Sequence, residues 1–169
     1  HSEIFWDEGI PADGFDLSVP MLEKARTRLS GRGADLRPGD LRTFRNGRTY
    51  DLAVAMFAVM GYLTTNEDWQ AGLATAATHL RPGGMLVFDG WFGPAVLAQK
   101  PESRRHAYQE DGLDVVREVT PELDAVEQTV TAHYRIRSHR GGRLESDFTE
   151  DHRMRFLFVQ ETKLLLRQA

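Results

Sequence analysis

The chain has 169 residues, 41% of them apolar, and a formal net charge of -4. This size suits one compact domain, and the absence of cysteine excludes disulfides, thiolate catalysis and zinc-thiolate sites. No segment clusters Lys and Arg, and no apolar run approaches the roughly 20 residues that cross a bilayer, so we expect a cytoplasmic protein with a small-molecule partner and neither nucleic-acid nor membrane partners.

Up to about residue 100, short apolar runs alternate with helical patterns. Such alternation is typical of a parallel sheet covered by helices, an α/β fold. The helix that follows Asp16 is well specified, with Ser18 as its N-cap and Pro20 in its first turn. The apolar runs that predict strands are 10–15, 34–36, 52–57 and 85–88, and the inward face of this helix is predicted from Met21, Leu22, Ala25 and Leu29.

A second helix is predicted over 66–80, with the run Pro82-Gly83-Gly84 as its stop and turn. Its inward residues are predicted to be Trp69, Leu73, Ala76 and Ala77. From Leu113 onward the pattern changes to antiparallel strands joined by hairpins, one of them at Gly141-Gly142, and the stretch 160–169 is helical in propensity.

Two acidic residues stand at predicted strand ends. Asp16 lies between a strand and a helix, where a carboxylate can hold the diol of a ribose. Asp40, in Gly39-Asp40-Leu41, follows the next strand along. Each has a local alternative, because Asp16 can cap the helix and Asp40 can belong to a turn. Their joint occurrence favours a ligand site.

Taken in order, residues 13–22, 39–41, 50–57 and 80–89 resemble a class I S-adenosylmethionine (SAM) dependent methyltransferase. The stretch 55–63, which ends Gly61-Tyr62-Leu63, resembles the amino-sugar N-methyltransferases of macrolide and related antibiotic pathways. The resemblance covers 14–166. It implies a Rossmann-like sheet, an antiparallel β platform inserted after the fifth strand, and methyl transfer from SAM to the amine of a nucleotide-linked amino sugar, with S-adenosylhomocysteine as product.

The resemblance also implies roles for single residues. Asp16 would accept from the ribose hydroxyls, Leu17 would pack on the adenine, and Asp40 would accept from the adenine amino group, while the next backbone N–H serves the ring. The catalytic candidates are Tyr62 and His152, although a lone histidine is more often structural. The remaining cofactor-site candidates are Met21, Gly39, Leu41, Met56 and Phe57, and the substrate-site candidates are Tyr62, Trp91 and Phe92, whose apolar members could equally belong to the core.

Methyl transfer from a sulfonium is an in-line displacement, so the protein mainly has to align the nucleophile, the carbon and the sulfur. An attacking amine must be neutral. Tyr62 or His152 could accept its hydrogen bond or its proton, directly or through water. No metal is expected, because the acids at 16, 40 and 89 fit neither a facial triad nor an EF-hand.

The glycine-rich turn that follows the first strand in SAM-binding folds is absent, since Gly9 and Gly14 have the wrong spacing. We therefore expect that the sequence omits the first strand, between Trp6 and Asp7, and the last two strands, after Ala169. Residues 1–6 would then belong to a lid helix. Within a single methyltransferase domain, 1–169, residues 7–100 would bind SAM and 101–160 would form the platform. The alternative is a sheet that lacks its central strand.

Three other functions stay open. The first is methylation of another small molecule, such as a phenol, a carboxylate or a peptide amine, because the SAM site does not encode the acceptor. The second is a nicotinamide-dependent oxidoreductase, which the Pro82-Gly83-Gly84 turn and the antiparallel insertion disfavour. The third is a non-catalytic binding module with a methyltransferase fold. A homodimer formed through the platform would follow from analogy alone.

Overall fold

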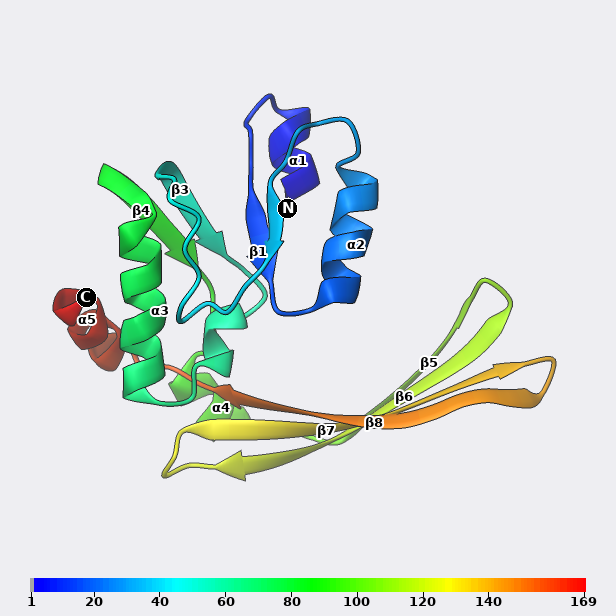
Figure 1. The fold of residues 1–169 in the computed structure, drawn as a ribbon. Coiled ribbons are helices and arrows are strands. Elements are labelled where there is room, and N and C mark those ends of the chain that lie inside the picture. The colour runs from blue at the N-terminus through cyan, green and yellow to red at the C-terminus, as the bar shows by residue number, and fades with distance from the viewer. Residues whose placement is uncertain (1) are drawn as a thin grey trace.

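The computed structural model describes residues 2–169, so His1 of the expected lid helix lies outside the described residues. Five α-helices, one 3-10 helix and eight strands make up this part of the chain (Figure 1). In chain order they are α1 (Ser2–Asp7), β1 (Gly14–Asp16), α2 (Val19–Arg28), β2 (Leu36–Pro38), β3 (Tyr50–Ala55), η1 (Val59–Tyr62), α3 (Asn66–Thr78), β4 (Leu80–Phe88), α4 (Gly93–Gln99), β5 (Arg104–Glu110), β6 (Leu113–Asp124), β7 (Thr129–Arg140), β8 (Arg143–Arg155) and α5 (Val159–Gln168).

The strands form three sheets. β1 pairs with β2 and β3 pairs with β4, both in parallel, whereas β5 to β8 form one antiparallel sheet in sequence order. We call this antiparallel sheet the platform. Its long strands run beneath the helices and parallel strands, and the carboxyl ends of β1 and β3 lie on the side of the α/β part that faces it (Figure 1). The predicted change from an α/β part to an antiparallel part is therefore confirmed.

Several predicted boundaries were wrong. β3 ends at Ala55 instead of residue 57, because Phe57 and Ala58 adopt left-handed conformations with φ of 63° and 56°. β1 covers Gly14–Asp16, so it begins four residues after the start of the predicted run 10–15 and ends one residue beyond it. The glycine turn near residue 83 lies inside β4 as an irregularity, where the pairing jumps from Tyr50 with Leu80 to Leu52 with Met85.

The helices confirm the capping signals but correct the buried faces. Ser18 accepts a hydrogen bond from the backbone N–H of Met21 at 3.4 Å, as an N-cap should. Met21 itself is 54% exposed, so it does not pack inward with Leu22. In α3 Ala77 is exposed as well, because steps of four residues drift by about 40° around a helix and carry this position off the buried face.

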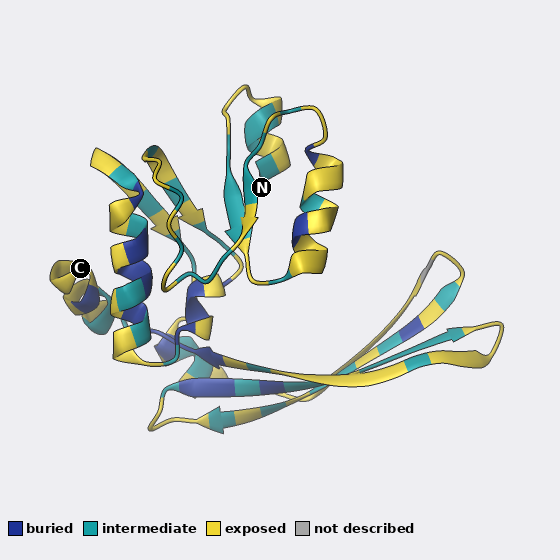
Figure 2. Cartoon of the chain, in the orientation of Figure 1, coloured by how far each residue is buried: buried dark blue, intermediate teal, exposed yellow. Residues whose placement is uncertain are grey.

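The main core lies where α3, η1, α5 and the end of the platform meet. Its buried members cluster around Trp69 and Leu73, and the partly buried Leu86 and Phe88 of β4 pack against them. Figure 2 shows the same distribution, with buried residues along α3 and near η1 and mostly exposed residues at the far end of the platform. The other buried members of the cluster are Met60, Leu63, Leu157 and Leu165. The structure thereby anchors one end of the platform against the α/β part.

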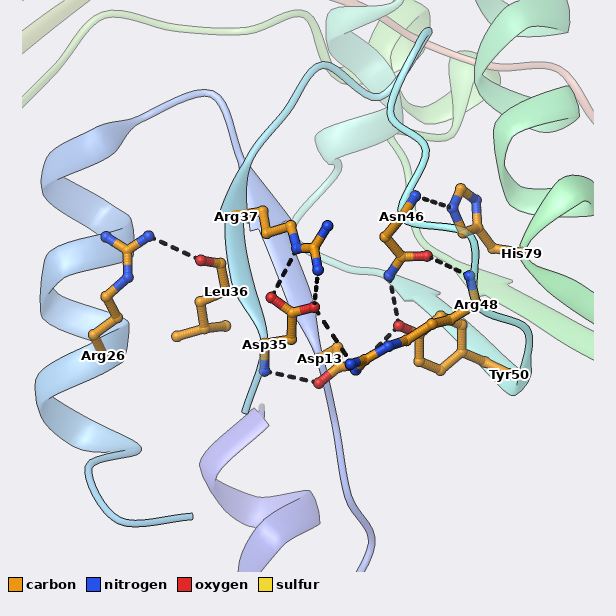
Figure 3. Close-up of polar contacts among 9 residues, drawn as sticks. All are labelled: Asp13, Arg26, Asp35, Leu36, Arg37, Asn46, Arg48, Tyr50 and His79. Atoms are coloured by element: carbon orange, nitrogen blue, oxygen red, sulfur yellow. Dashed lines mark hydrogen bonds and ion pairs between the residues drawn. The ribbon is translucent and has the colours of Figure 1, made fainter. Parts of the chain in front are cut away.

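A polar network links the two parallel pairs of strands (Figure 3). One carboxylate oxygen of Asp13 accepts from the hydroxyl of Tyr50 at 2.8 Å and from Arg48 at 2.9 Å. Asn46 donates to the same hydroxyl at 2.7 Å and, through its backbone N–H, to His79. Burial raises the pKa of Asp13, but hydrogen bonds from Asp35, Tyr50 and Arg48 outweigh burial and hold it below its usual value.

Candidate active site

Tyr62 is placed by the turn that follows β3. The carboxylate of Asp89, at the end of β4, accepts from the backbone N–H of Ala58 at 2.6 Å and so holds this left-handed turn in place. η1 then brings Tyr62 over the platform. Gly61 permits this approach, because a Cβ there would lie 3.2 Å from the carbonyl oxygen of Arg155 and from a carbon of Met154. Asp89 therefore fixes the backbone that carries Tyr62.

His152 comes from β8 and meets Tyr62 directly. The hydroxyl of Tyr62 lies 2.6 Å from Nδ1 of His152, and Nε2 of the same ring lies 3.3 Å from a carboxylate oxygen of Glu150. Glu150 favours a proton on Nε2, which leaves Nδ1 as the acceptor for the tyrosine O–H. The ring of Tyr134 completes the cluster, with its centroid 5.4 Å from that of His152.

The environment affects the acidity of Tyr62. Burial raises its pKa above the ordinary value, and the nearby Tyr134 and Glu150 raise it further because they disfavour a second negative charge. Tyr62 is thus a neutral hydroxyl at physiological pH. It can donate to His152 and still accept a hydrogen bond from another molecule.

The two predicted cofactor carboxylates stand at adjacent strand ends. The backbone N–H of Gly39 donates to the carbonyl of Asp16 at 3.1 Å, which brings the ends of β1 and β2 together. A carboxylate oxygen of Asp16 also accepts from the N–H of Ser18 at 2.8 Å. Asp16 thus holds the N–H of the cap residue Ser18 and does not itself cap α2, and its exposed side chain keeps further acceptor positions.

Asp40 forms an ion pair that sequence reasoning missed. Arg42 donates to both oxygens of Asp40, with its Nη2 at 2.6 Å from one of them, and it also reaches Asp68 at 3.2 Å. Arg42 supplies the main hydrogen bonds that hold the pKa of Asp40 below its usual value. Asp40 is consequently a fixed carboxylate, and any ligand amine would share an oxygen with Arg42.

Large apolar side chains are exposed near these strand ends. Leu17 is 71% exposed and Phe57 is 81% exposed, while Met56 is half-buried. Exposed apolar groups of this size beside paired carboxylates fit the flat, partly apolar surface of a nucleoside. Leu41 differs from them, because its side chain packs against the core cluster.

Trp91 and Phe92 lie beside the segment that leads into α5, and the contacts of these two residues are with that segment instead of with Tyr62 and His152. The carbonyl of Trp91 accepts from the N–H of Leu157 at 2.8 Å, and Phe92 forms a bridge with the same residue. A groove of about 230 Å³ between these segments is lined by both aromatic residues and by Phe158 and Thr162. Their predicted contact with substrate has no geometric support from the residues around Tyr62.

A cavity of about 680 Å³ lies along the platform. Most of its lining belongs to the face opposite His152, because side chains alternate along a strand. His133 and Arg135 are on that opposite face, where each forms an ion pair with an aspartate. Only three lining residues, Arg104, Val119 and Tyr134, belong to the face of His152. Neither Tyr62 nor His152 lines this cavity.

The residues present fit part of the expected cofactor. Two adjacent strand-end carboxylates and exposed apolar groups suit an adenosine, whereas the described residues contain no glycine-rich turn for the methionine end. Among residues 2–169 no three His, Asp or Glu side chains gather as metal ligands would, and the absence of a metal stays a prediction. No helix of this described part has the length and apolar character to span a membrane.

Comparison with known proteins gives one family match and several named relatives. Residues 4–84 match the family described as methyltransferase domain. A dTDP-3-amino-3,4,6-trideoxy-alpha-D-glucopyranose N,N-dimethyltransferase of Streptomyces venezuelae is 43% identical over 98 residues, a match that spans 58% of the chain and 40% of the relative. A dTDP-3-amino-3,6-dideoxy-alpha-D-glucopyranose N,N-dimethyltransferase of Streptomyces fradiae is 35% identical over 48% of the chain and 31% of its own length.

Two solved structures cover nearly the whole chain. DesVI of Streptomyces venezuelae matches 98% of the chain with a TM-score of 0.80 and 27% identity, over 67% of its own length. SAM-bound CalS10 of Micromonospora echinaspora, described as an amino pentose methyltransferase, matches 97% of the chain and 67% of itself with a TM-score of 0.77 and 24% identity, and so supports the fold alone.

The fold is an α/β fold like that of SAM-dependent methyltransferases, and this chain resembles that class. Within the class, its relatives by sequence are aminosugar N-methyltransferases. The chain nevertheless spans well under half of the length of the curated relatives that it matches, 40% for the first and 31% for the second.

Proposed function

We propose that this protein transfers a methyl group from SAM to the amine of a nucleotide-linked amino sugar. The observation that carries the proposal is the contact between Tyr62 and His152. These two predicted catalytic residues are 90 positions apart in the sequence. The printed names of the sequence relatives support the choice of acceptor, since they describe N,N-dimethyltransferases of dTDP-amino sugars.

In this proposal Asp16 and Asp40 hold the adenosine part of the cofactor through its ribose hydroxyls and its amino group, and Leu17, Met21 and Met56 supply apolar contacts. Bound SAM supplies a methyl carbon that is already activated by its positive sulfur. The protein therefore has to bring a neutral amine into line with that carbon and to accept the proton that the amine loses.

Tyr62 and His152 provide a route for that proton. The amine donates an N–H to the oxygen of Tyr62, whose own O–H already points to Nδ1 of His152. The methyl group would leave the sulfur of the cofactor, which keeps the electron pair, as it joins the nitrogen, and the proton of the amine would pass to the tyrosine oxygen while that of the tyrosine passes to His152. Glu150, 3.3 Å from Nε2, then stabilises the imidazolium. Glu150 is thus a positioning residue that sequence reasoning missed.

We also infer that β1 and β3 flank a central strand that this sequence does not contain. Each has one edge without a strand partner among residues 2–169, and the described links between the two pairs of strands are made by side chains, chiefly Asp13 with Tyr50. Parallel strands normally pair on both edges inside a covered sheet. On this proposal, residues 7–100 form the SAM-binding part and 101–160 the platform of a single methyltransferase domain.

A calorimetric titration with S-adenosylhomocysteine, with NAD as the control ligand, tests the proposal. We expect S-adenosylhomocysteine alone to bind, with a dissociation constant on the order of micromolar. Binding of NAD would favour the oxidoreductase, and binding of neither would leave a non-catalytic module. Product analysis with an amino sugar nucleotide and its hydroxyl analogue then separates N-methylation from O-methylation, since only the amine should gain mass.

A further inference from the structure

The platform presents two chemically different faces. Because neighbouring side chains alternate and directly paired residues share a face, the pairing of Val119 with Tyr134 and of Arg104 with Val119 places these residues together. The ring contact of Tyr134 with His152 shows that this face is the one that meets Tyr62. Arg117 lies two positions from Val119 along the same strand and therefore belongs to the same face.

Arg117 is connected to the reaction centre by a continuous chain of contacts. Its guanidinium carbon lies 5.6 Å from the centroid of the Tyr134 ring, a cation–π arrangement. The Tyr134 centroid lies 5.4 Å from that of His152, which in turn binds Tyr62. A sugar bound with its amine at Tyr62 could therefore extend across Tyr134 toward Arg117.

The cations on this face lack the carboxylate partners that those of the opposite face have. On the opposite face Arg135 pairs with Asp147 at 2.7 Å, and Arg137 and Arg105 pair with Glu118 at 2.7 and 3.5 Å. Among the described side chains, Arg104, His106 and Arg117 form no ion pair, although His106 is directly opposite Arg117 in the pairing of β5 with β6. The carboxylate of the same face nearest the reaction centre, Glu150, is engaged by His152.

We propose that Arg117, supported by Arg104, binds the diphosphate of a nucleoside-diphosphate substrate whose sugar lies over Tyr134. A guanidinium can donate two parallel hydrogen bonds to a phosphate, and stacking on an aromatic ring orients its planar fork before the ligand arrives. This inference rests on the proposed function, because it assigns one end of the same substrate. It also explains why uncompensated positive charge lies beside a proposed reaction centre in an acidic protein.

The test is a calorimetric titration of the full chain with thymidine diphosphate and, separately, with thymidine, in the presence of S-adenosylhomocysteine. The variants are Arg117→Gln, Arg104→Gln and Arg117→Lys, with Arg135→Gln as the matched control from the opposite face. We expect Arg117→Gln to weaken diphosphate binding about tenfold or more, since it removes a charge-assisted hydrogen bond to phosphate. We expect thymidine affinity to stay unchanged, Arg117→Lys to recover part of the loss, and Arg135→Gln to bind as the wild type does.

The inference is overturned if the wild type does not bind the diphosphate, if Arg117→Gln binds it normally, or if Arg135→Gln loses as much. Unfolding midpoints are measured in parallel, and a lowered midpoint in Arg117→Gln alone would also count against it, because the side chain is exposed. Affinity for S-adenosylhomocysteine distinguishes failure of the diphosphate site from failure of the proposed function. Normal cofactor binding with an unaffected Arg117→Gln removes only the diphosphate site, whereas absence of cofactor binding removes the methyltransferase activity.

Discussion

The hydroxyl of Tyr62 lies 2.6 Å from Nδ1 of His152, although the two residues are 90 positions apart in the sequence. One of them ends the turn after β3, and the other lies on the platform. The contact therefore joins the α/β part to the platform through a polar link. A donor and an acceptor held at this distance form a preorganised route for a proton.

Replacing either member of this pair should impair methyl transfer without affecting the cofactor. We expect Tyr62→Phe and His152→Gln each to lower kcat by roughly 10²- to 10⁴-fold, the usual contribution of general acid–base catalysis. Since the two side chains act on the same proton, the double variant should be little worse than the poorer single variant. His139→Gln, on the same platform but outside the cluster, is the control. Multiplicative losses in the double variant would show that the pair does not act as a unit.

The ionisation of Tyr62 offers a test that does not depend on activity. Burial, followed by Tyr134 and Glu150, raises the pKa of Tyr62, so Glu150→Gln should lower that pKa toward the ordinary value of about 10. The phenolate absorbance of each protein, after subtraction of the Tyr62→Phe spectrum, measures it. An unchanged midpoint in Glu150→Gln would exclude an influence of Glu150 on the pair.

The same shift predicts how stability depends on pH. A pKa that folding raises contributes stability that is fully present below the pKa of the unfolded chain and is lost as the pH rises through the folded value. The wild type should therefore lose stability relative to Tyr62→Phe as the pH rises above about 10, and the difference should be constant at neutral pH. Urea unfolding across this range checks the sign, and a difference that grows toward acidic pH would contradict it.

Local signals in the sequence were sufficient for much of the α/β part. The cap at Ser18 and the core positions Trp69 and Leu73 depend on residues a few positions apart, and each was predicted correctly. β5 was missed because it is an edge strand with mostly polar, exposed residues, which give no alternating pattern. The left-handed conformation of Phe57 had no signal either, since it depends on Asp89, 31 residues from Ala58.

The candidate site could be predicted as a set of residues but not as an arrangement. Strand ends indicated Asp16 and Asp40, yet the contact of Arg42, the ion-pair partner of Asp40, with Asp68 of α3 depends on how α3 packs. The role of Glu150 could not be predicted without knowing that Glu150 shares a face of the platform with His152 and that Tyr62 contacts that face. Such contacts across the fold follow from topology, which a single sequence specifies only weakly.

A side chain at position 39 should lower both the stability of the fold and the affinity for the cofactor. A Cβ at this position would clash with the ring of Phe44, which stacks on Phe15 of β1 at a centroid distance of 4.1 Å. Gly39→Ala should therefore displace both rings, cost about 1–3 kcal/mol of unfolding free energy, and weaken binding of S-adenosylhomocysteine between Asp16 and Asp40. Phe44→Leu in the Gly39→Ala background should restore part of the unfolding free energy and part of the affinity for S-adenosylhomocysteine. Unfolding and calorimetry measure the two effects, and full stability of Gly39→Ala would show that the ring moves freely.

The attachment of the platform to the last helix depends on a buried cation. Arg155 at the end of β8 is 6% exposed, pairs with Glu161 of α5, and donates to the side-chain oxygen of Asn66 in α3 at 2.7 Å. Glu161→Gln would leave this charge without its anion, so we expect a loss of about 3 kcal/mol of unfolding free energy. The double variant Arg155→Met/Glu161→Leu should lose less, because no charge is then buried.

An exposed ion pair provides the matched control for Glu161. Arg81 and Asp51 form a similar contact, but their side chains are 57% and 77% exposed, so water already solvates both charges. Asp51→Asn should therefore cost less than about 1 kcal/mol. Chemical denaturation of the four proteins gives the comparison, and equal losses for Glu161→Gln and Asp51→Asn would mean that Arg155 is solvated in solution. A larger loss at Glu161 would instead identify this buried pair as the main polar link between the platform, α3 and α5, the elements that hold His152 against Tyr62.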